Sequence, residues 1–202
     1  PGLTMMDRRT LLQRIAAAAG TSFALGGSLA VELAHAAEGR APGAPLPATL
    51  MPTLSALAEL IIPATDTPGA TAAGVPAFVA GMFQHWMNDA ERTRFSEGLQ
   101  ALEADAQRRF SLAFDKASTV QQAEVFGALR DGLQGWRPTG GFGLGARVAD
   151  PTAPFFHKAR DLVAIGYFTS EVGIQAELAY VQVPGRFDGD VDVATWNRQM
   201  QL

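Results

Sequence analysis

The sequence predicts an all-α protein: a single small helical domain with a long Gly/Pro-rich loop and an extended C-terminal tail. Apolar residues recur at helical spacing in several segments, most clearly between residues 75 and 88. Residue types that favour helix N-termini precede several of these segments. No stretch shows the sustained apolar–polar alternation of a β-strand. The length of 202 residues and the apolar fraction of 48% suit one globular domain and argue against a disordered chain.

The first 36 residues are predicted to be a targeting segment. Arg8 and Arg9 precede a Leu-Leu pair and an Ala/Gly-rich apolar run. Ala34 and Ala36 supply small residues at positions −3 and −1 of a cleavage site. The run is too diluted by glycine and serine for a membrane-spanning helix, which needs about 20 strongly apolar residues. The segment resembles a twin-arginine signal, which exports folded proteins to the periplasm. An uncleaved anchor helix is the alternative.

A Pro-rich linker is expected over residues 37–52, and the helical domain over residues 53–202. Apolar spacing predicts the first helix of the domain from Thr53 to Ile62, where Pro63 ends it. In the loop that follows, Pro68-Gly69 suits a type II turn.

Three amphipathic helices are expected next. The first runs from Val75 to Asn88, and Asp89 is predicted to cap the second, which ends near Phe110. The segment from Thr119 to Gln122 has the pattern of a capping box and opens the third. The stripe of the first helix consists of Val75, Phe78, Val79, Met82, Phe83 and Trp86. The third helix is expected to carry Val120, Ala123, Phe126 and Leu133 along its apolar side.

Glycine and proline interrupt the helical pattern between Gly135 and Pro154, which predicts a loop. A further helix is expected from about Pro154, with Tyr167 buried near its end. Thr169 or Ser170 can cap the short helix that follows, and Glu171 is favourable at the N-terminus of that helix. The tail to Leu202 has Trp196 as its only large anchor.

Composition excludes several classes of function. The pI of about 5.3 and the net charge of −4 argue against a nucleic-acid-binding surface. The absence of cysteine excludes disulfides, thiolate metal sites and covalently attached c-type haem on this chain. Removal of the leader would leave a net charge of −5, which favours a neutral or basic partner surface.

The sequence offers no catalytic, cofactor or metal site. Residues 141–146 match G-x-G-x-x-A, but no strand is predicted before them, so a mobile or partner-ordered loop is the better interpretation. His85, on the polar flank of its helix, and His157 lack ligand spacing to other metal-binding residues. Ser170-Glu171 has no histidine partner that would make it a nucleophile.

Two stretches resemble the gluconate 2-dehydrogenase subunit 3 family, the small or gamma subunit. They are ELIIPATDTPGATAAGVPAFV at residues 59–79 and GYFTSEVGIQAELAYVQVPG at residues 166–185. Whether the signature residues belong to the core or to a partner interface is open. These residues are Tyr167, Phe168, Thr169, Ser170, Glu171, Gly173, Tyr180, Pro184 and Trp196.

The resemblance implies a non-catalytic small subunit of a periplasmic FAD-dependent sugar or sugar-acid dehydrogenase. FAD is then expected on a large subunit of the glucose–methanol–choline type, with no cofactor on this chain. A c-type cytochrome subunit and the twin-arginine export machinery are further expected partners, and the complex could associate with the membrane. Two alternatives are a free-standing exported helical binding protein and an enzyme in its own right.

Overall fold

The computed structural model describes residues 43–131, 133, 135–138 and 144–178. Within these residues the fold is all-α, with seven α-helices and no β-strand, as the sequence predicts. The α-helices are α3 (Met51–Ile61), α4 (Val75–His85), α5 (Asp89–Phe110), α6 (Thr119–Asp131), α7 (Leu144–Ala149), α8 (Phe155–Phe168) and α9 (Glu171–Glu177). Two short 3-10 helices, η1 (Ala48–Leu50) and η2 (Phe114–Lys116), precede α3 and α6.

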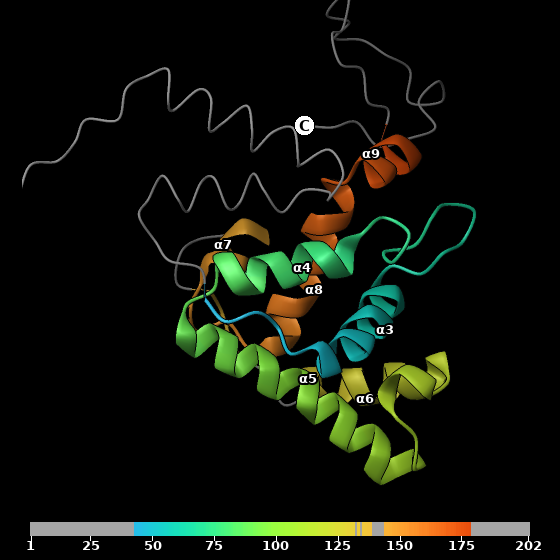
Figure 1. Cartoon of the computed structure of the whole chain (residues 1–202), viewed down its shortest axis with the longest axis vertical. Helices are drawn as coiled ribbons and strands as arrows, with labels where there is room; N and C mark the ends of the chain where they lie inside the picture. The colour runs from blue at the N-terminus through green and yellow to red at the C-terminus, as the bar shows by residue number, and fades with distance from the viewer. Residues whose placement is uncertain (1–42, 132, 134, 139–143, 179–202) are drawn as a thin grey trace, which may run out of the picture.

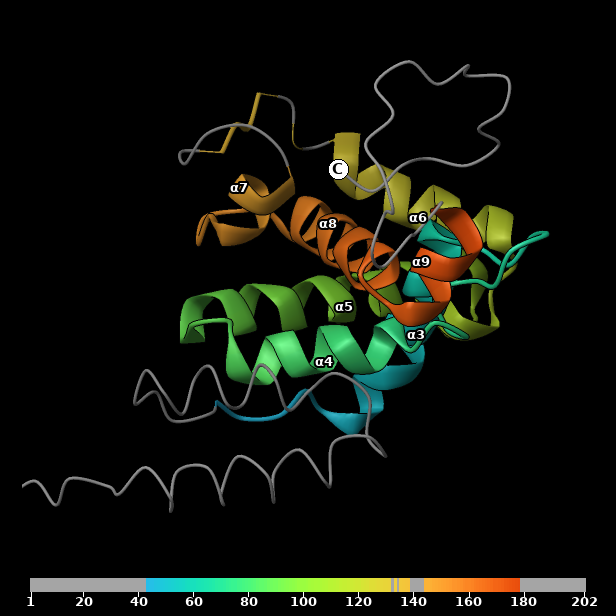
Figure 2. The same cartoon turned by 90° about the horizontal axis from the view of Figure 1, so that it is seen from above.

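Helix α8 is the central element of the fold and contacts each of the other described α-helices. Figure 2 shows α4 and α5 on one side of it and α6 and α7 on the other. Helix α9 continues from its carboxy-terminal end, and α5 forms the opposite edge of the molecule (Figure 1). Residues far apart in the sequence therefore meet on α8.

The core is built mainly from apolar side chains of α3, α4, α5 and α8, with contributions from η2 and α6. Helical spacing places one residue in three or four on the buried face, so each helix contributes a row of side chains to the same interior. The fully buried larger side chains are Leu54, Leu57, Val75, Val79, Phe95, Leu99, Leu102, Phe114, Val125, Leu162, Val163 and Tyr167. Pro76 lies in the first turn of α4, where its missing N–H is not needed.

Two predicted helix starts are wrong by one residue. Asn88, and not Asp89, caps α5: its side chain accepts a hydrogen bond from the Glu91 N–H, and the Glu91 carboxylate accepts one from the Asn88 N–H. Ser118 and Gln121 form the corresponding reciprocal pair at the start of α6, where Thr119 to Gln122 was expected. At α5 the reciprocal partner three positions later decides between two residues that can cap. At α6 both candidates have a glutamine three positions later, and Gln122 bonds to the Phe114 carbonyl instead.

The buried side of α6 also differs from the prediction. Val120 is 79% exposed, and Val125, which was not predicted on the apolar side, is buried. Phe126 is buried as predicted. The Gln122 side chain turns inward and donates to the Phe114 carbonyl at 2.8 Å, so this polar residue is buried with a partner. With Gln122, Val125 and Phe126 on the buried side of α6, Val120 faces away from the core.

The amino-terminal boundary of the fold is earlier than expected. Helix α3 begins at Met51 and not at Thr53, and Pro52 lies in its first turn. Within the predicted linker, Leu46 and Leu50 are buried and the Gly43 N–H donates to the Gln84 carbonyl at 2.8 Å. Residues 43–50 therefore pack against the helices.

The Pro68-Gly69 turn is not of type II, because Gly69 has no positive φ; the positive φ in this loop belongs to Gly74. The interrupted stretch before Pro154 is not all loop either, since it contains α7. No described helix is long and apolar enough to cross a membrane.

Candidate functional site

The two stretches that resemble the subunit 3 family meet in the structure. The Tyr167 hydroxyl on α8 donates a hydrogen bond to the Pro68 carbonyl at 2.8 Å. Tyr167 itself is 1% exposed, so its ring is part of the core while its hydroxyl reaches the turn between α3 and α4. A buried phenol needs such a partner. Burial, opposed by a hydrogen bond with Thr67 and reinforced by the nearby Glu177 carboxylate, raises the pKa of Tyr167 above its ordinary value.

Glu59 fixes the same turn from the α3 side. Its carboxylate accepts hydrogen bonds from the backbone N–H groups of Ala64 and Thr71, both at 2.9 Å. Burial alone would raise the pKa of Glu59, but the hydrogen bonds from Thr71 and Ala64 outweigh it and lower the pKa below its ordinary value. A Cβ on Gly69 would come within 3.0 Å of both the Glu59 carboxylate and the Ala64 nitrogen, so glycine permits this close approach.

Helix α9 is attached to the turn and to α8. Ser170 caps it, accepting from the Gly173 N–H at 2.9 Å, and donates its hydroxyl to the Tyr167 carbonyl at 2.7 Å. This confirms the predicted capping role of Ser170. Thr67 donates to the Glu177 carboxylate at 2.6 Å, which joins the turn to the last residue of the helix. A Cβ on Gly173 would lie within 3.0 Å of the Tyr167 carbonyl, so this corner also needs glycine.

The predicted signature residues divide between the core and the surface. Tyr167 and Gly173 are buried, and Ser170 is half-buried. Phe168 is 42% exposed, and Thr169 and Glu171 are exposed. Tyr180, Pro184, Trp196 and the four predicted leader residues Arg8, Arg9, Ala34 and Ala36 lie outside the described residues.

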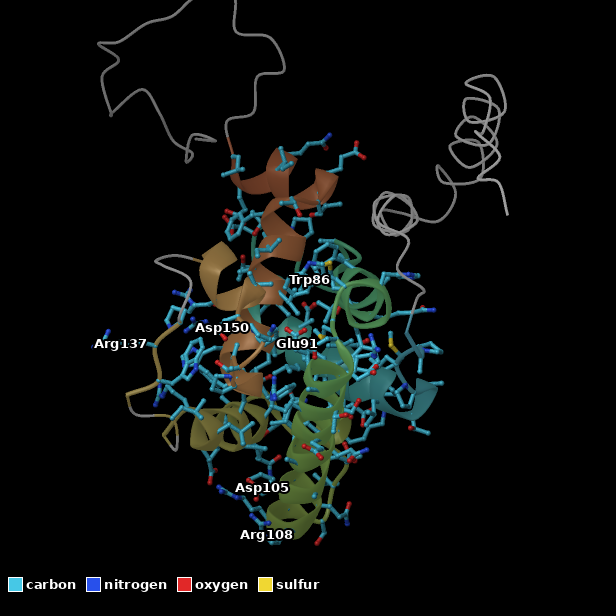
Figure 3. All side chains as sticks on the ribbon, turned by 90° about the vertical axis from the view of Figure 1, so that its left-hand side faces the viewer. Trp86, Glu91, Asp105, Arg108, Arg137 and Asp150 are labelled. Atoms are coloured by element: carbon cyan, nitrogen blue, oxygen red, sulfur yellow. The ribbon has the colours of Figure 1, made fainter. Side chains whose placement is uncertain are left out.

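A buried ionic cluster, which the sequence interpretation missed, lies at the other end of α8. Lys158 is 3% exposed and forms an ion pair with Glu91 of α5. Its ammonium group also donates to the carbonyls of Val148 at 2.8 Å and Asp150 at 3.1 Å, and it lies 5.2 Å from the centre of the Trp86 ring. Figure 3 shows Trp86, Glu91 and Asp150 toward the middle of the molecule, unlike Arg108 and Asp105 at the end of α5.

This cluster explains why the Gly/Pro-rich stretch contains a helix. Lys158 uses its three donors on Glu91 and on two carbonyls at the end of α7, and Glu91 also completes the capping box of α5. One side chain thus joins α5, α7 and α8. A lysine four residues after a proline in an apolar helix was the available signal, because buried lysines need a partner.

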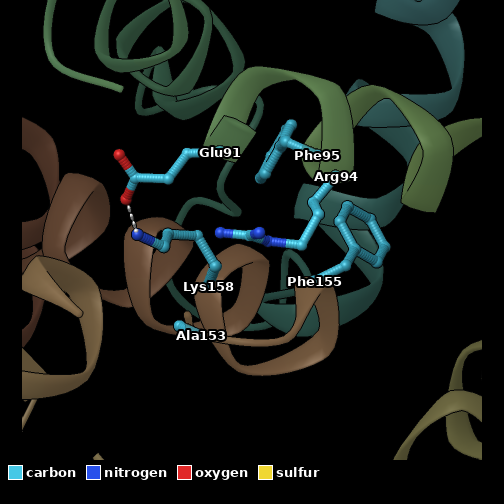
Figure 4. Close-up of a pocket in the computed structure, with 6 residues that line it drawn as sticks. All are labelled: Glu91, Arg94, Phe95, Ala153, Phe155 and Lys158. Atoms are coloured by element: carbon cyan, nitrogen blue, oxygen red, sulfur yellow. Dashed lines mark hydrogen bonds and ion pairs between the residues drawn. The ribbon is translucent and has the colours of Figure 1, made fainter. Parts of the chain in front are cut away.

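A small cavity lies beside the ionic cluster (Figure 4). It is lined by Glu91, Arg94, Phe95, Ala153, Phe155 and Lys158. Its volume of about 10 Å³ has room for a single water molecule and not for a cofactor or a sugar. The Nε atom of Arg94 is buried without a hydrogen-bond partner, so a water molecule there would satisfy it.

The histidines differ from one another. His85 is buried at the end of α4, and the prediction that it lies on a polar flank is wrong. His157 stacks on Trp136 with ring centres 5.0 Å apart. Burial and the nearby Arg160 and Arg147 lower the pKa of His157, although Asp161 opposes them. Asp161 is fully buried and pairs with both arginines.

The described residues contain no group of three or more histidine, aspartate or glutamate side chains that could hold a metal ion. Residues 141–143 of the glycine-rich match lie outside the described residues, and no described strand precedes α7 as a dinucleotide site would require. What the described geometry does provide is a rigid junction between a surface turn, α8 and α9.

Comparisons with known proteins gave one match. No curated protein and no solved structure matches the chain. The gluconate 2-dehydrogenase subunit 3 family matches residues 48–185, which include both stretches that meet at Tyr167 and Pro68. The match covers more than half of the 202 residues. The chain therefore belongs to the gluconate 2-dehydrogenase subunit 3 family.

Proposed function

We propose that this chain is the non-catalytic small subunit of a periplasmic FAD-dependent dehydrogenase that oxidises a hydroxyl of a sugar or sugar acid. Its role is to stabilise and mature the flavoprotein large subunit, which is of the glucose–methanol–choline type. The observation that carries the proposal is membership of the subunit 3 family over residues 48–185. A family defined as one subunit of a dehydrogenase implies that other chains complete the complex.

The division of labour assigns FAD and the chemistry to the large subunit. The polar residues around Tyr167 make structural hydrogen bonds to one another and to backbone groups. Electrons from the reduced flavin would pass to an acceptor such as a c-type cytochrome subunit or a quinone.

The test is to purify the tagged full-length chain from its own cells and to record the visible absorbance of the eluate. The proposal expects a flavin spectrum, a co-purifying protein of flavoprotein size and sugar-dependent reduction of a dye. A colourless monomer from well-expressing cells would contradict it and support a free-standing binding protein. Dye reduction by the isolated chain would instead indicate an enzyme in its own right.

Export is part of the proposal. If the large subunit carries no signal of its own, the Arg8-Arg9 leader would carry the folded, FAD-loaded pair to the periplasm, because the twin-arginine route accepts folded proteins. Replacing Arg8 and Arg9 by lysine should then retain both subunits in the cytoplasm. Normal export of the large subunit in that variant would show that the two chains travel separately.

A further inference from the structure

Basic side chains are confined to one part of the described structure. Every lysine, arginine and histidine among the described residues falls between residues 85 and 160. The described segments 43–84 and 161–178 have none. Their acidic residues are Glu59, Asp66, Asp161, Glu171 and Glu177. The contacts of α8 with α4 and α9, and the Tyr167–Pro68 hydrogen bond, bring parts of these two segments together.

Two of these carboxylates face solvent without a basic neighbour in either segment. Glu59 is satisfied by backbone N–H groups, and Asp161 is buried between Arg147 and Arg160. Asp66 and Glu171 are exposed. Among the described residues, the charged side chains exposed on the turn and on α9 are therefore acidic.

The turn between α3 and α4 is exposed, and residues outside it hold it by hydrogen bonds. Of residues 63–68, all except the half-buried Thr67 are exposed. Glu59, Tyr167 and Glu177 each bond to the turn or to the residues that flank it. A loop that is already ordered loses little conformational freedom when a partner covers it, so more of the contact energy appears as affinity.

An exposed aromatic side chain follows Tyr167, the residue that bonds to the turn. Phe168 is 42% exposed, and its ring lies 5.4 Å from that of Tyr167 in an edge-to-face arrangement. Of the described residues, the other exposed large apolar ones are Leu112, between α5 and α6, and Val120, in the first turn of α6. The connection between α5 and α6 lies at the opposite end of the molecule from α9 (Figure 1). Aromatic residues are the commonest anchors of protein interfaces.

We propose that the exposed turn 63–68, Phe168 and Glu171, together called the motif face, form the surface by which this chain docks on the large subunit of the dehydrogenase. The matching surface of the large subunit is basic around an apolar recess that receives the Phe168 ring. This inference rests on the proposed function. Charge complementarity favours such a partner over a second copy of this chain, because two acidic faces would repel each other.

The experiment uses co-expression of the large subunit with the tagged full-length chain and measures how much large subunit is retained. Phe168→Ala should weaken binding by about tenfold or more, since truncating a buried aromatic anchor has effects of this size. The double variant Asp66→Lys/Glu171→Lys should weaken it by at least about tenfold through like-charge repulsion. Controls are Val120→Ala for the apolar change and Glu97→Lys, on exposed α5 surface, for a single charge reversal, to be compared with Glu171→Lys alone. Both controls should retain the large subunit.

Salt supplies a second readout. Raising the ionic strength should weaken the native complex, because exposed charge pairs are screened at about 8 to 10 Å near physiological salt. Asp66→Asn/Glu171→Gln should reduce that salt dependence. A salt response that is the same in this variant and in the native chain would remove the electrostatic part of the proposal.

Several outcomes would overturn the inference. If the native chain retains the large subunit and the motif-face variants retain it equally well, the docking surface lies elsewhere, although the proposed function stands. If the native chain retains no large subunit, the proposed function itself fails. A dimer of the isolated chain that Phe168→Ala converts to a monomer would assign the face to a second copy. A large fall in the melting temperature of isolated Phe168→Ala would mean that the chain's own residues cover the ring.

Discussion

The two halves of α8 hold their neighbours by different chemistry. The amino-terminal half carries Lys158, Arg160 and Asp161, and through Lys158 it joins α5 and α7 by a buried ion pair and two charge-assisted hydrogen bonds. The carboxy-terminal half, residues 162–168, has no charged side chain and holds the turn through the Tyr167 hydroxyl.

This difference indicates how each half should respond to change. A buried charge that loses its partner keeps its full desolvation penalty, whereas a neutral hydrogen bond that is lost leaves a smaller one. The ionic half should therefore be far more sensitive to substitution than the neutral half. It also connects elements that local sequence does not order, while the neutral half fixes a turn that the sequence already favours.

The largest effect is expected from Lys158→Met. This variant leaves Glu91 buried without its cation and removes the donor to the end of α7, so the free energy of unfolding should fall by about 3 to 5 kcal/mol. Denaturant unfolding measures it. Lys116→Met is the control, because Lys116 is 72% exposed and its pair with Asp115 should contribute less than about 1 kcal/mol. An equal fall in the free energy of unfolding in both variants would show that the buried ion pair of Lys158 is no more important than the exposed one of Lys116.

A smaller loss is expected where the backbone of the neutral half is crowded. Gly173→Ala places a Cβ against the Tyr167 carbonyl, and relieving that overlap should lower the free energy of unfolding by about 1 to 3 kcal/mol. Gly127→Ala on α6 is the matched substitution, since its Cβ meets nothing within 4 Å. It should raise stability by about 1 kcal/mol through helix propensity. Thermal unfolding of both variants tests whether crowding at the glycine decides if alanine stabilises or destabilises the protein.

Tyr167→Phe tests the neutral half directly. It leaves the Pro68 carbonyl without the phenol donor while keeping the ring in the core, so a loss of about 1 kcal/mol is expected. Amide hydrogen exchange should accelerate at Thr67 and Ala70 and remain unchanged at the end of α7. Faster exchange at both places would show that the two halves of α8 are not independent.

The smallest effect concerns pH and the ionic half. The pKa of His157 is lowered from 6.5 by burial and by Arg160 and Arg147. The unfolded chain therefore binds this proton more readily, and stability should decrease as the pH falls from above 6.5 toward the lowered pKa, then level off. His157→Asn should flatten this dependence in unfolding experiments across that range. Protonation of Glu59 also lowers stability, but in a separate range, because the pKa of Glu59 is lowered and this loss comes only as the pH falls below 4.5.

Sequence reasoning predicted the apolar stripe of α4 because the face on which each residue lies follows from helical spacing alone. It could not choose between Asn88 and Asp89 as a cap, since both residue types serve and only the paired Glu91 distinguishes them. Helix α7 was missed because its order comes from Lys158, which is distant in sequence, and not from local propensity. The Tyr167–Pro68 contact is likewise tertiary: each stretch was recognised, but their meeting depends on how α8 crosses α4.

The position of α8 has a consequence for the order in which the protein folds. The contacts that anchor it join residues far apart in the sequence: Lys158 and Glu91 are separated by 67 residues, and Tyr167 and Pro68 by 99. The entropy of closing such loops is lost before these contacts form, which slows folding. A nascent chain that ends before α8 already contains the segments of α3 to α6. It lacks the helix against which these segments pack. Their apolar stripes then stay open to solvent, so the chain is most prone to aggregate in the interval before α8 leaves the ribosome.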